Sequence, residues 1–245
     1  LIRVNRMQIA TQKVFMTPWF TLERSDSTLP IFISRPEDVT HALEALSDAQ
    51  RLAASGREFT GQAGELVKLY SPEGGLIGVL YGAGDRSGDE IGPLAIGRLA
   101  RRLPAGTYMI ALRPVEWDFN VMATGWGLGC YKFDRYLPEK NVPAQLVLTE
   151  NYKPEETIAL VRAIHRGRDL INTPAGDMGP EELHAEVVAV AEKYDAKITA
   201  VIGDDLLAEN YPMIHAVGRA GPQPPRLVEF TWGDPQYPSL ALVGK

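Results

Sequence analysis

Residues 154–202 read PEETIALVRAIHRGRDLINTPAGDMGPEELHAEVVAVAEKYDAKITAVI, and this segment carries most of the information about the fold. Pro-Glu-Glu occurs twice, beginning at Pro154 and at Pro180. Proline suits the first position of a helix, and two acids suit the positive end of the helix dipole. Apolar residues follow at helical spacing both times, and residues 197–202 then form an apolar run typical of a strand. The segment predicts helix, loop, helix and strand, with the first helix running to Leu170.

The same alternation extends toward the N-terminus. Short apolar runs predict strands, and Pro36 and Pro104 mark the start of one predicted helix and the end of another. The turn residues Ser71-Pro72-Glu73-Gly74-Gly75 join two of the runs and predict a hairpin. The predicted strands are 31–33, 66–70, 76–81, 106–112 and 144–149, and the predicted helices begin at 36 and span 91–103. This alternation is typical of an α/β layer structure.

Toward the C-terminus, strands are predicted at 227–232 and 240–243. The second of these runs leads directly into Gly244 and Lys245. In α/β proteins, the ends of buried strands are where ligands bind and chemistry takes place. We therefore expect the chain to be a piece of a longer protein, ending at or beside its active site.

The composition narrows the class of protein. The chain has 245 residues, 45% of them hydrophobic and 23% charged, which is typical of a globular protein. Its 25 Lys and Arg against 31 Asp and Glu give a net charge of −6, which argues against nucleic acid as a partner. The single cysteine, Cys130, forms no internal disulfide and indicates a reducing compartment. No apolar run approaches the roughly 18 residues that a membrane span needs.

Cys130 and the histidines carry little chemical signal. No base lies near Cys130 in the sequence, so we expect a packed thiol rather than a nucleophile. The histidines show no helical metal-pair spacing such as H-E-x-x-H, and we expect solvated or internally bonded side chains. They are His41, His165, His184 and His215.

Three glycine-containing loops are candidates for binding. Residues 81–88 approach a dinucleotide fingerprint, but the third glycine comes one residue late and a hairpin precedes the loop, so an ordinary turn is favoured. Residues 172–180 hold Asn, Asp and two prolines, and residues 218–226 hold two glycines and three prolines. Such stiff loops, which fix polar groups in place, often border sites.

Four segments in this order resemble the leucyl aminopeptidase family of metallopeptidases. They are Gly167-Arg168-Asp169-Leu170-Ile171-Asn172-Thr173-Pro174, Met178-Gly179-Pro180-Glu181-Glu182-Leu183, Ala216-Val217-Gly218-Arg219 with Pro224-Pro225-Arg226-Leu227-Val228, and Leu242-Val243-Gly244-Lys245. The resemblance covers residues 163–245, and no diagnostic motif precedes Glu150. This chain departs from the family at Gly176, where Asn is usual, at Gly179, where Thr is usual, and in the run Gly218-Arg219-Ala220-Gly221.

The resemblance implies an architecture and an activity. It implies a macro-domain-like N-terminal α/β domain over residues 1–150, a linking helix over 151–171 and the first part of a larger α/β peptidase domain over 172–245. It further implies a cytoplasmic homo-hexamer that releases N-terminal, leucine-like residues from peptides. Two divalent metal ions, Mn or Zn with Mg or Co as alternatives, would serve the hydrolysis.

In the family, the lysine of the V-G-K-G motif is a metal ligand, and the matching residue here is Lys245. An ordinary lysine, with a pKa of about 10.4, is protonated at neutral pH. A divalent cation together with burial lowers that pKa until the neutral amine binds the metal. The other ligands and the catalytic residues come later in the family's sequence. We therefore expect residues 1–245 alone to be inactive.

A second hypothesis comes from another class of function. Residues 1–150 would act as a non-catalytic module for binding or for assembly of the oligomer. The ligand would be nucleotide-like, bound through Gly82 to Gly88, or DNA, which the charge of −6 supports little.

Overall fold

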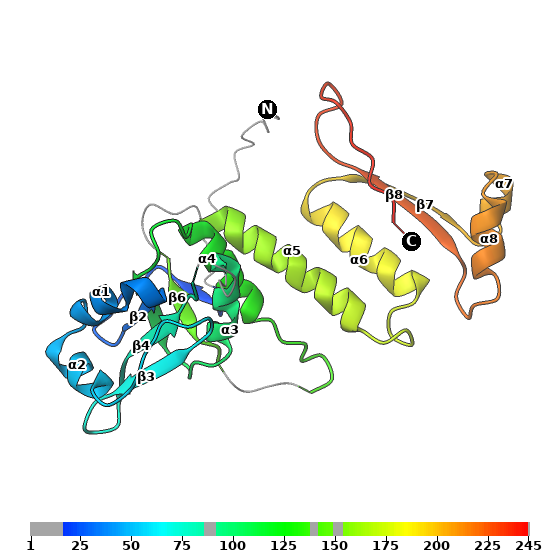
Figure 1. Cartoon of the computed structure of the whole chain (residues 1–245). Helices are drawn as coiled ribbons and strands as arrows, with labels where there is room; N and C mark the ends of the chain where they lie inside the picture. Colours follow the sequence, from blue (N-terminus) through cyan, green and yellow to red (C-terminus); the bar gives the residue numbers. More distant parts are fainter. Residues whose placement is uncertain (1–16, 86–91, 138–141, 149–153, 245) are drawn as a thin grey trace. The chain divides into compact units, whose positions relative to one another are not determined.

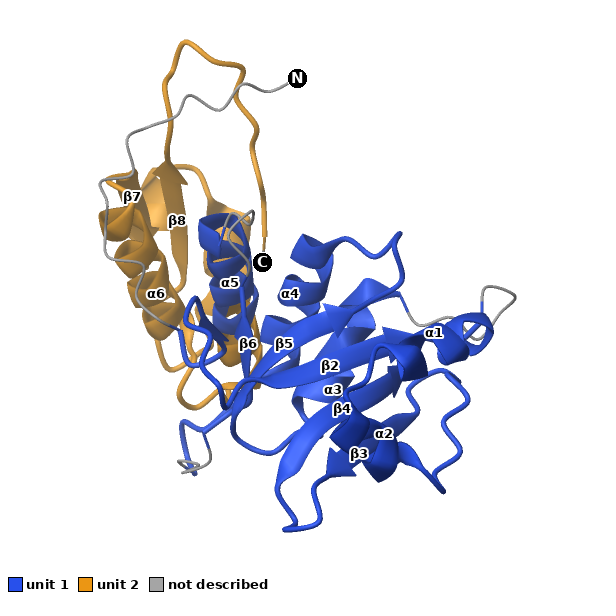
Figure 2. Cartoon of the chain, turned by 90° about the vertical axis from the view of Figure 1, so that its left-hand side faces the viewer, with its two compact units in different colours: residues 1–166 blue, residues 167–245 orange. Residues whose placement is uncertain are grey.

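The computed structural model describes residues 17–85, 92–137, 142–148 and 154–244. The chain divides into two compact units, Leu1–Arg166 and Gly167–Lys245, which Figure 2 distinguishes by colour. Strands and helices alternate along most of the first unit, as Figure 1 shows. The predicted α/β class is therefore confirmed.

Unit 1 is built on a six-stranded sheet with the order β1-β6-β5-β2-β4-β3. All neighbouring strands run parallel except β3 and β4, which are antiparallel. The parallel arrangement brings the carboxyl ends of β2, β4 and β5 to one edge of the sheet. The strands are β1 (Phe20–Thr21), β2 (Leu29–Ser34), β3 (Leu66–Tyr70), β4 (Leu76–Gly82), β5 (Thr107–Leu112) and β6 (Gln145–Val147).

The predicted hairpin is confirmed by the pairing of β3 with β4. In its turn, the Ser71 amide donates to the Gly75 carbonyl over 2.8 Å. Gly74 has a φ of +84°, a conformation that residues with a Cβ rarely adopt. The turn chemistry at this site explains why the sequence signal was reliable.

Helices cover both faces of this sheet, and two apolar cores result. Along β2, Ile31 and Ile33 pack in one core with α3 and α4, whereas Phe32 packs in the other core, on the face that carries α1. This alternation follows from the two-residue period of a strand. The helical elements are η1 (Pro36–Asp38), α1 (Val39–Glu44), α2 (Asp48–Ala54), η2 (Pro93–Ile96), α3 (Gly97–Ala100) and α4 (Phe119–Gly129).

Two helix predictions in unit 1 need correction. The helix expected over 91–103 is shorter, because it comprises only η2 and α3, and Ile91 lies outside the described residues. The sequence analysis did not predict α4, which contains Gly125, Gly127 and Gly129. Glycine disfavours an isolated helix, so tertiary packing must stabilise this one.

The helix expected from Pro154 is α5 (Pro154–Asn172), and the boundary between the two compact units falls within it. The predicted division into residues 1–150, 151–171 and 172–245 stays a prediction. Unit 2 continues with α6 (Pro180–Lys193), β7 (Lys197–Ile202), α7 (Asp205–Ala208), α8 (Pro212–Gly218) and β8 (Arg226–Thr231). β7 and β8 form an antiparallel pair from Lys197↔Thr231 to Ile202↔Arg226.

The prediction of a buried strand over 240–243 is wrong for this structure. These residues form no strand, and Leu240, Leu242 and Val243 are 84%, 88% and 96% exposed. An apolar run forms a strand only when a neighbouring strand satisfies its backbone groups and covers its side chains. Within the described residues, the only strands of unit 2 are β7 and β8, and they pair with each other.

Candidate functional site

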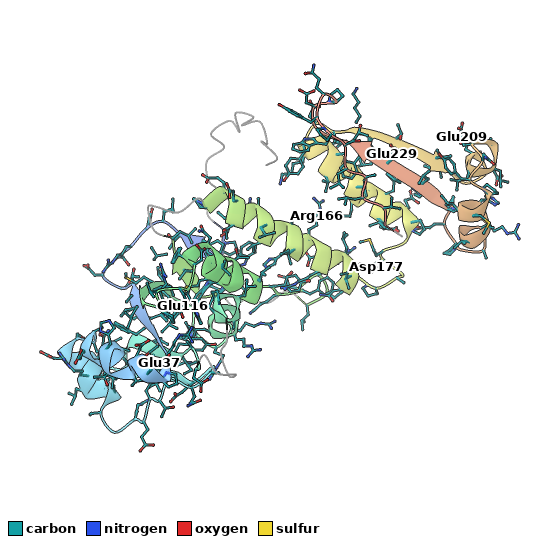
Figure 3. The ribbon with its side chains drawn as sticks, turned by 45° about the horizontal axis from the view of Figure 1, so that its top comes forward. Glu37, Glu116, Arg166, Asp177, Glu209 and Glu229 are labelled. Carbon is teal, nitrogen blue, oxygen red and sulfur yellow. The ribbon has the colours of Figure 1, made fainter. Side chains whose placement is uncertain are left out.

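The loop between α5 and α6 is held in place by its own hydrogen bonds. The amide and the hydroxyl of Thr173 both donate to the Asp169 carbonyl, over 2.9 and 2.7 Å. The Asp177 amide donates to the Pro174 carbonyl over 2.8 Å, and Figure 3 shows Asp177 in this loop. The loop that the sequence analysis singled out is therefore a defined turn that leads into the start of α6.

The first turn of α6 is capped by one of its own acids. Gly179 is the N-cap, and its amide donates to Glu182 Oε2 over 2.9 Å. This bond is one half of a capping box. The pKa of Glu182 is lowered from its ordinary value, first by a hydrogen bond from the Gln223 side chain and also by backbone bonds that include the Gly179 amide. The charged carboxylate is thus the form that this site stabilises.

Gln223 joins the two loops that the sequence analysis singled out separately. Its Nε2 donates to both carboxylate oxygens of Glu182, over 3.1 and 2.9 Å, while its Oε1 accepts from the Glu181 amide over 2.8 Å. We call the set Gly179, Glu181, Glu182 and Gln223 the Gln223 bridge. It fixes the loop before β8 against the N-terminus of α6.

At two positions of this junction an added Cβ would force a neighbour to move, the end of the Gln223 side chain at Gly179 and Pro225 at Gly218. A Cβ on Gly179 would lie 2.5 Å from Gln223 Oε1, closer than real Cβ atoms approach other atoms. A Cβ on Gly218 would lie 2.4 Å from the Pro225 Cβ. The departure from the family's usual Thr at Gly179 therefore has a structural reason in this chain, because Gln223 occupies the space.

Arg226 adds a second link between β8 and α6. Its Nη1 lies 3.1 Å from His184 Nδ1 and its Nη2 lies 4.0 Å from Glu181 Oε2. Arginine has no acceptor, so the Nδ1 of His184 accepts this bond. His184 is therefore an internally bonded side chain, as expected, and its role is to hold the start of β8.

The predicted metal ligand, Lys245, lies outside the described residues. Gly244, just before it, has open space where a Cβ would lie. Across the described ranges, no group of three or more His, Cys, Asp or Glu side chains is arranged to hold a metal ion. The residues that the structure describes do not by themselves fit a two-metal centre.

Of the other three histidines, His41 on α1 is exposed, and His165 and His215 have partners within the chain. His165 is buried in unit 1, where its Nε2 lies 3.0 Å from the Gly127 carbonyl and its ring packs against Trp19 and Tyr131. His215 Nε2 lies 3.1 Å from Asp204 Oδ1. Both His165 and His215 therefore have a partner within their own unit.

Cys130 is a packed thiol, as predicted. Burial raises its pKa to about 12, although Arg101 and Lys132 oppose this shift. Its Sγ donates to the Ala144 carbonyl over 3.8 Å. At neutral pH the side chain is therefore a protonated thiol, which is a poor nucleophile.

The described part of the loop after β4 offers no phosphate cradle of the kind that the nucleotide hypothesis requires, because its amides are already bonded. The amides of Gly82, Ala83 and Gly84 donate to the carbonyls of Glu65, Ser34 and Gly61, respectively. A Cβ on Gly82 would lie 1.8 Å from the Gln62 carbonyl oxygen, so a close backbone approach explains this glycine. Residues 86–88 of the proposed loop lie outside the described residues.

The sequence analysis missed two polar centres. One is Gln223, which no motif distinguished from other glutamines. The other is Arg35, which is 1% exposed. Its Nε donates to Glu116 Oε1 over 3.0 Å, and its Nη1 donates to the Gly84 carbonyl over 3.2 Å. Its position two residues after the apolar run Ile31-Phe32-Ile33 was a usable signal, because a charge there falls at the end of a buried strand.

Two family models match the chain. Residues 29–149 match the M17 aminopeptidase N-terminal domain, and residues 165–245 match the catalytic domain of the cytosol aminopeptidase family. The chain belongs to the cytosol aminopeptidase (M17) family. The resemblance to leucyl aminopeptidases is therefore confirmed, and it extends over the N-terminal region, where the sequence analysis found no motif.

Relatives of the cytosol aminopeptidase family are named as probable enzymes. The probable cytosol aminopeptidase of Streptomyces avermitilis is 30% identical over 226 residues, covering 80% of this chain and 43% of that protein. The one from Leifsonia xyli subsp. xyli is 32% identical over 213 residues, covering 80% of this chain and 42% of that protein. The chain thus spans less than half the length of these relatives.

Solved structures of the family share the fold. The cytosol aminopeptidase of Coxiella burnetii has a TM-score of 0.77 at 30% identity, covering 89% of this chain and 47% of that chain. The bottromycin maturation enzyme BotP, in complex with Mn, has a TM-score of 0.68 at 22% identity, covering 86% and 46%. Among the described residues, no helix combines the length and the apolar composition that crossing a bilayer requires.

Proposed function

We propose that this chain is part of an aminopeptidase that removes N-terminal, leucine-like residues from peptides in the cytoplasm. The observation that carries the proposal is the match of residues 165–245 to the catalytic domain of the cytosol aminopeptidase family. Family membership and the names of the relatives support the activity at the level of an aminopeptidase. The preference for leucine rests on the resemblance alone.

In the proposed enzyme, the described residues of this chain hold helices and strands in position and do not themselves carry out the chemistry. The Gln223 bridge and Arg226 fasten β8 to the N-terminus of α6, using bonds to the Glu182 carboxylate and to His184. A site on a rigid element keeps its geometry better than a site on a free loop. The bridge lies just before the start of β8, and the chain continues from the other end of this strand into the segment that ends at Lys245.

The proposed enzyme uses two divalent metal ions, Mn or Zn with Mg or Co as alternatives, and Lys245 is one ligand. Such ions supply a nucleophilic water and polarise the scissile carbonyl. The described residues do not complete such a centre. Because the chain spans less than half the length of its relatives, the proposal assigns the remaining ligands to the rest of the catalytic domain. In the complete gene product, Lys245→Arg retains the charge but cannot donate a lone pair. We expect it to bind less manganese per subunit, measured by elemental analysis after gel filtration, while its circular dichroism stays unchanged.

The activity itself has a direct test. The complete gene product with added Mn should release p-nitroaniline from leucine p-nitroanilide and not from its N-acetylated analogue, because an aminopeptidase requires the free amine. Equal hydrolysis of both substrates would indicate a different hydrolase, and hydrolysis of neither would contradict the proposal.

The proposed partners are peptide substrates and further copies of the chain in a homo-hexamer. The assembly hypothesis for residues 1–150 is compatible with this enzyme, because a module that organises the oligomer need not carry chemistry. Light scattering of the complete gene product checks the expected mass of six subunits. A monomer at working concentration would contradict the hexamer and leave the proposed chemistry standing.

A further inference from the structure

A hollow lies beside β3, which is an edge strand of the unit 1 sheet. Its volume is about 520 Å³, and its lining residues are Arg57, Leu66, Lys68, Tyr70 and Arg102. Three of these five side chains are cations. Leu66, Lys68 and Tyr70 alternate along β3 and so project from the same face of the strand. We call this hollow the β3-edge pocket.

Backbone carbonyls hold both arginines of the pocket in place. Arg57 Nη1 donates to the Lys68 carbonyl over 3.1 Å, and Arg102 Nη1 donates to the Gly64 carbonyl over 2.8 Å. A carbonyl positions a guanidinium without neutralising it, and each of these two bonds uses only one of the five N–H donors of its arginine. The two positive charges are therefore fixed in place rather than cancelled by these contacts.

Two acids adjoin pocket residues in sequence, the exposed Glu58 beside Arg57 and Glu65 beside Leu66, and the second serves its own loop. The Glu65 carboxylate accepts bonds from the amides of Thr60 and Gln62 and from the Thr60 hydroxyl, at 2.9 to 3.2 Å. The chain as a whole has a charge of −6. Although the net charge of the chain is negative, three cations around one hollow make this part of the surface positive, which favours an anionic ligand.

Protection of an edge strand explains part of this arrangement. Covering outward carbonyls with charged side chains discourages pairing with another strand. That role accounts for the two arginine bonds, but it does not require Lys68 to line the same hollow. Protection of the edge also does not require Tyr70 to line the hollow, where this side chain is 41% exposed and offers an aromatic face. Convergent cations beside an aromatic ring suit a phosphate chain, with or without an attached base.

We propose that the β3-edge pocket binds a compact anion that carries two or more phosphate groups. Arg57, Lys68 and Arg102 contact the phosphates, and Tyr70 stacks on a base when the anion is a nucleotide. The ligand is either free pyrophosphate or the diphosphate of a nucleotide, which share this chemistry. The site is separate from the loop after β4, whose described amides are already bonded within the chain.

Calorimetry with residues 1–245 tests the proposal, using inorganic pyrophosphate and ADP as the two probes. We expect saturable binding of pyrophosphate that weakens as salt is added. Lys68→Gln should lower the association constant about tenfold, the factor that corresponds to losing one charge-assisted hydrogen bond. Among the described residues, no hydrogen bond involves the Lys68 ammonium, so this variant should fold normally, which thermal unfolding checks. Lys193→Gln, the same change at the end of α6 in unit 2, is the matched control and should bind like the parent.

The two probes separate the sources of the phosphate. If ADP binds more tightly than pyrophosphate and Tyr70→Ala removes only that gain, the ligand is a nucleotide. If the two probes bind equally and Tyr70→Ala changes neither, the ligand is a free phosphate compound, and the site stands. The proposal is overturned if neither probe gives saturable heat, if a folded Lys68→Gln variant binds like the parent, or if the three cations bind duplex DNA without competition from pyrophosphate.

Discussion

At the scale of single residues, Gln223 links two segments of unit 2 that are far apart in the sequence. One amide side chain contacts the Glu182 carboxylate and the Glu181 amide, residues about forty positions earlier in the chain. A glutamine among three prolines carries no sequence signal for such a role. Gly179, by contrast, belonged to a motif, but the reason for the glycine became clear only with the position of Gln223.

Gln223→Ala should lower the free energy of unfolding by about 1 kcal/mol, because the part-buried bonds to the Glu182 carboxylate and the exposed bond from the Glu181 amide are lost. Urea unfolding followed by circular dichroism measures the change. Gln236→Ala is the matched control, since the Gln236 side chain is exposed. It should stay within about 0.5 kcal/mol of the parent. Equal effects of the two variants would show that the bridge contributes no stability.

Gly179→Thr restores the residue that is usual in the family and should destabilise the chain, because its Cβ would collide with Gln223 Oε1. In the double variant with Gln223→Ala, the collision is removed. The two substitutions should therefore cost less together than the sum of their separate effects, in a double-mutant cycle of unfolding free energies. Strict additivity would contradict the assigned contact.

The lowered pKa of Glu182 predicts that the stability of the chain depends on pH. Its pKa in the folded chain lies below the ordinary value of 4.5, mainly because of the bond from Gln223. A depressed carboxyl pKa contributes stability that is fully present above 4.5 and is lost as the pH falls through the folded pKa. Denaturation profiles across this acidic range should therefore be flatter for Glu182→Gln than for the parent. Glu192→Gln, an exposed position on the same helix, should keep the parent's profile.

At the scale of elements, the sequence predicted the helices and strands whose ends carry characteristic turn or helix-start residues. The β3–β4 hairpin has a Pro-Glu-Gly-Gly turn, and α5 and α6 both begin with Pro-Glu-Glu. The helix α4 was missed because its glycines reduce the local signal, although those glycines are what its packing needs. A Cβ on Gly125 would lie 2.4 Å from the Leu94 carbonyl oxygen, and one on Gly129 would lie 2.1 Å from that of Gly97.

Gly129→Ala should therefore destabilise the chain by about 1–3 kcal/mol, the usual cost of overpacking. Gly167→Ala is the matched control, because Gly167 lies within α5 and its added Cβ would meet no atom within 4 Å. There alanine should stabilise the helix by up to about 1 kcal/mol. Thermal unfolding of the two variants measures these opposite shifts, and shifts of the same sign would contradict the close packing of α3 and α4.

At the scale of the whole molecule, the structure supplies a scaffold and few of the groups that chemistry needs. No cluster of potential ligands lies within residues 17–85, 92–137, 142–148 or 154–244. Near the end of the chain, Leu242 and Val243 are exposed, as Trp232 is to a smaller extent. The sequence pattern of residues 240–243 predicted a buried strand, but the pattern cannot supply the neighbouring strand that burial requires. The relatives, which are about twice as long, fit the view that the site draws on further sequence.

Hydrolysis of leucine p-nitroanilide by purified residues 1–245, compared with the complete gene product at equal concentration and with added Mn, tests this view most directly. We predict release of p-nitroaniline by the complete protein and none above the metal-only background by residues 1–245. Activity of residues 1–245 alone would contradict the proposed site, because that site requires ligands that the proposal places outside residues 1–245.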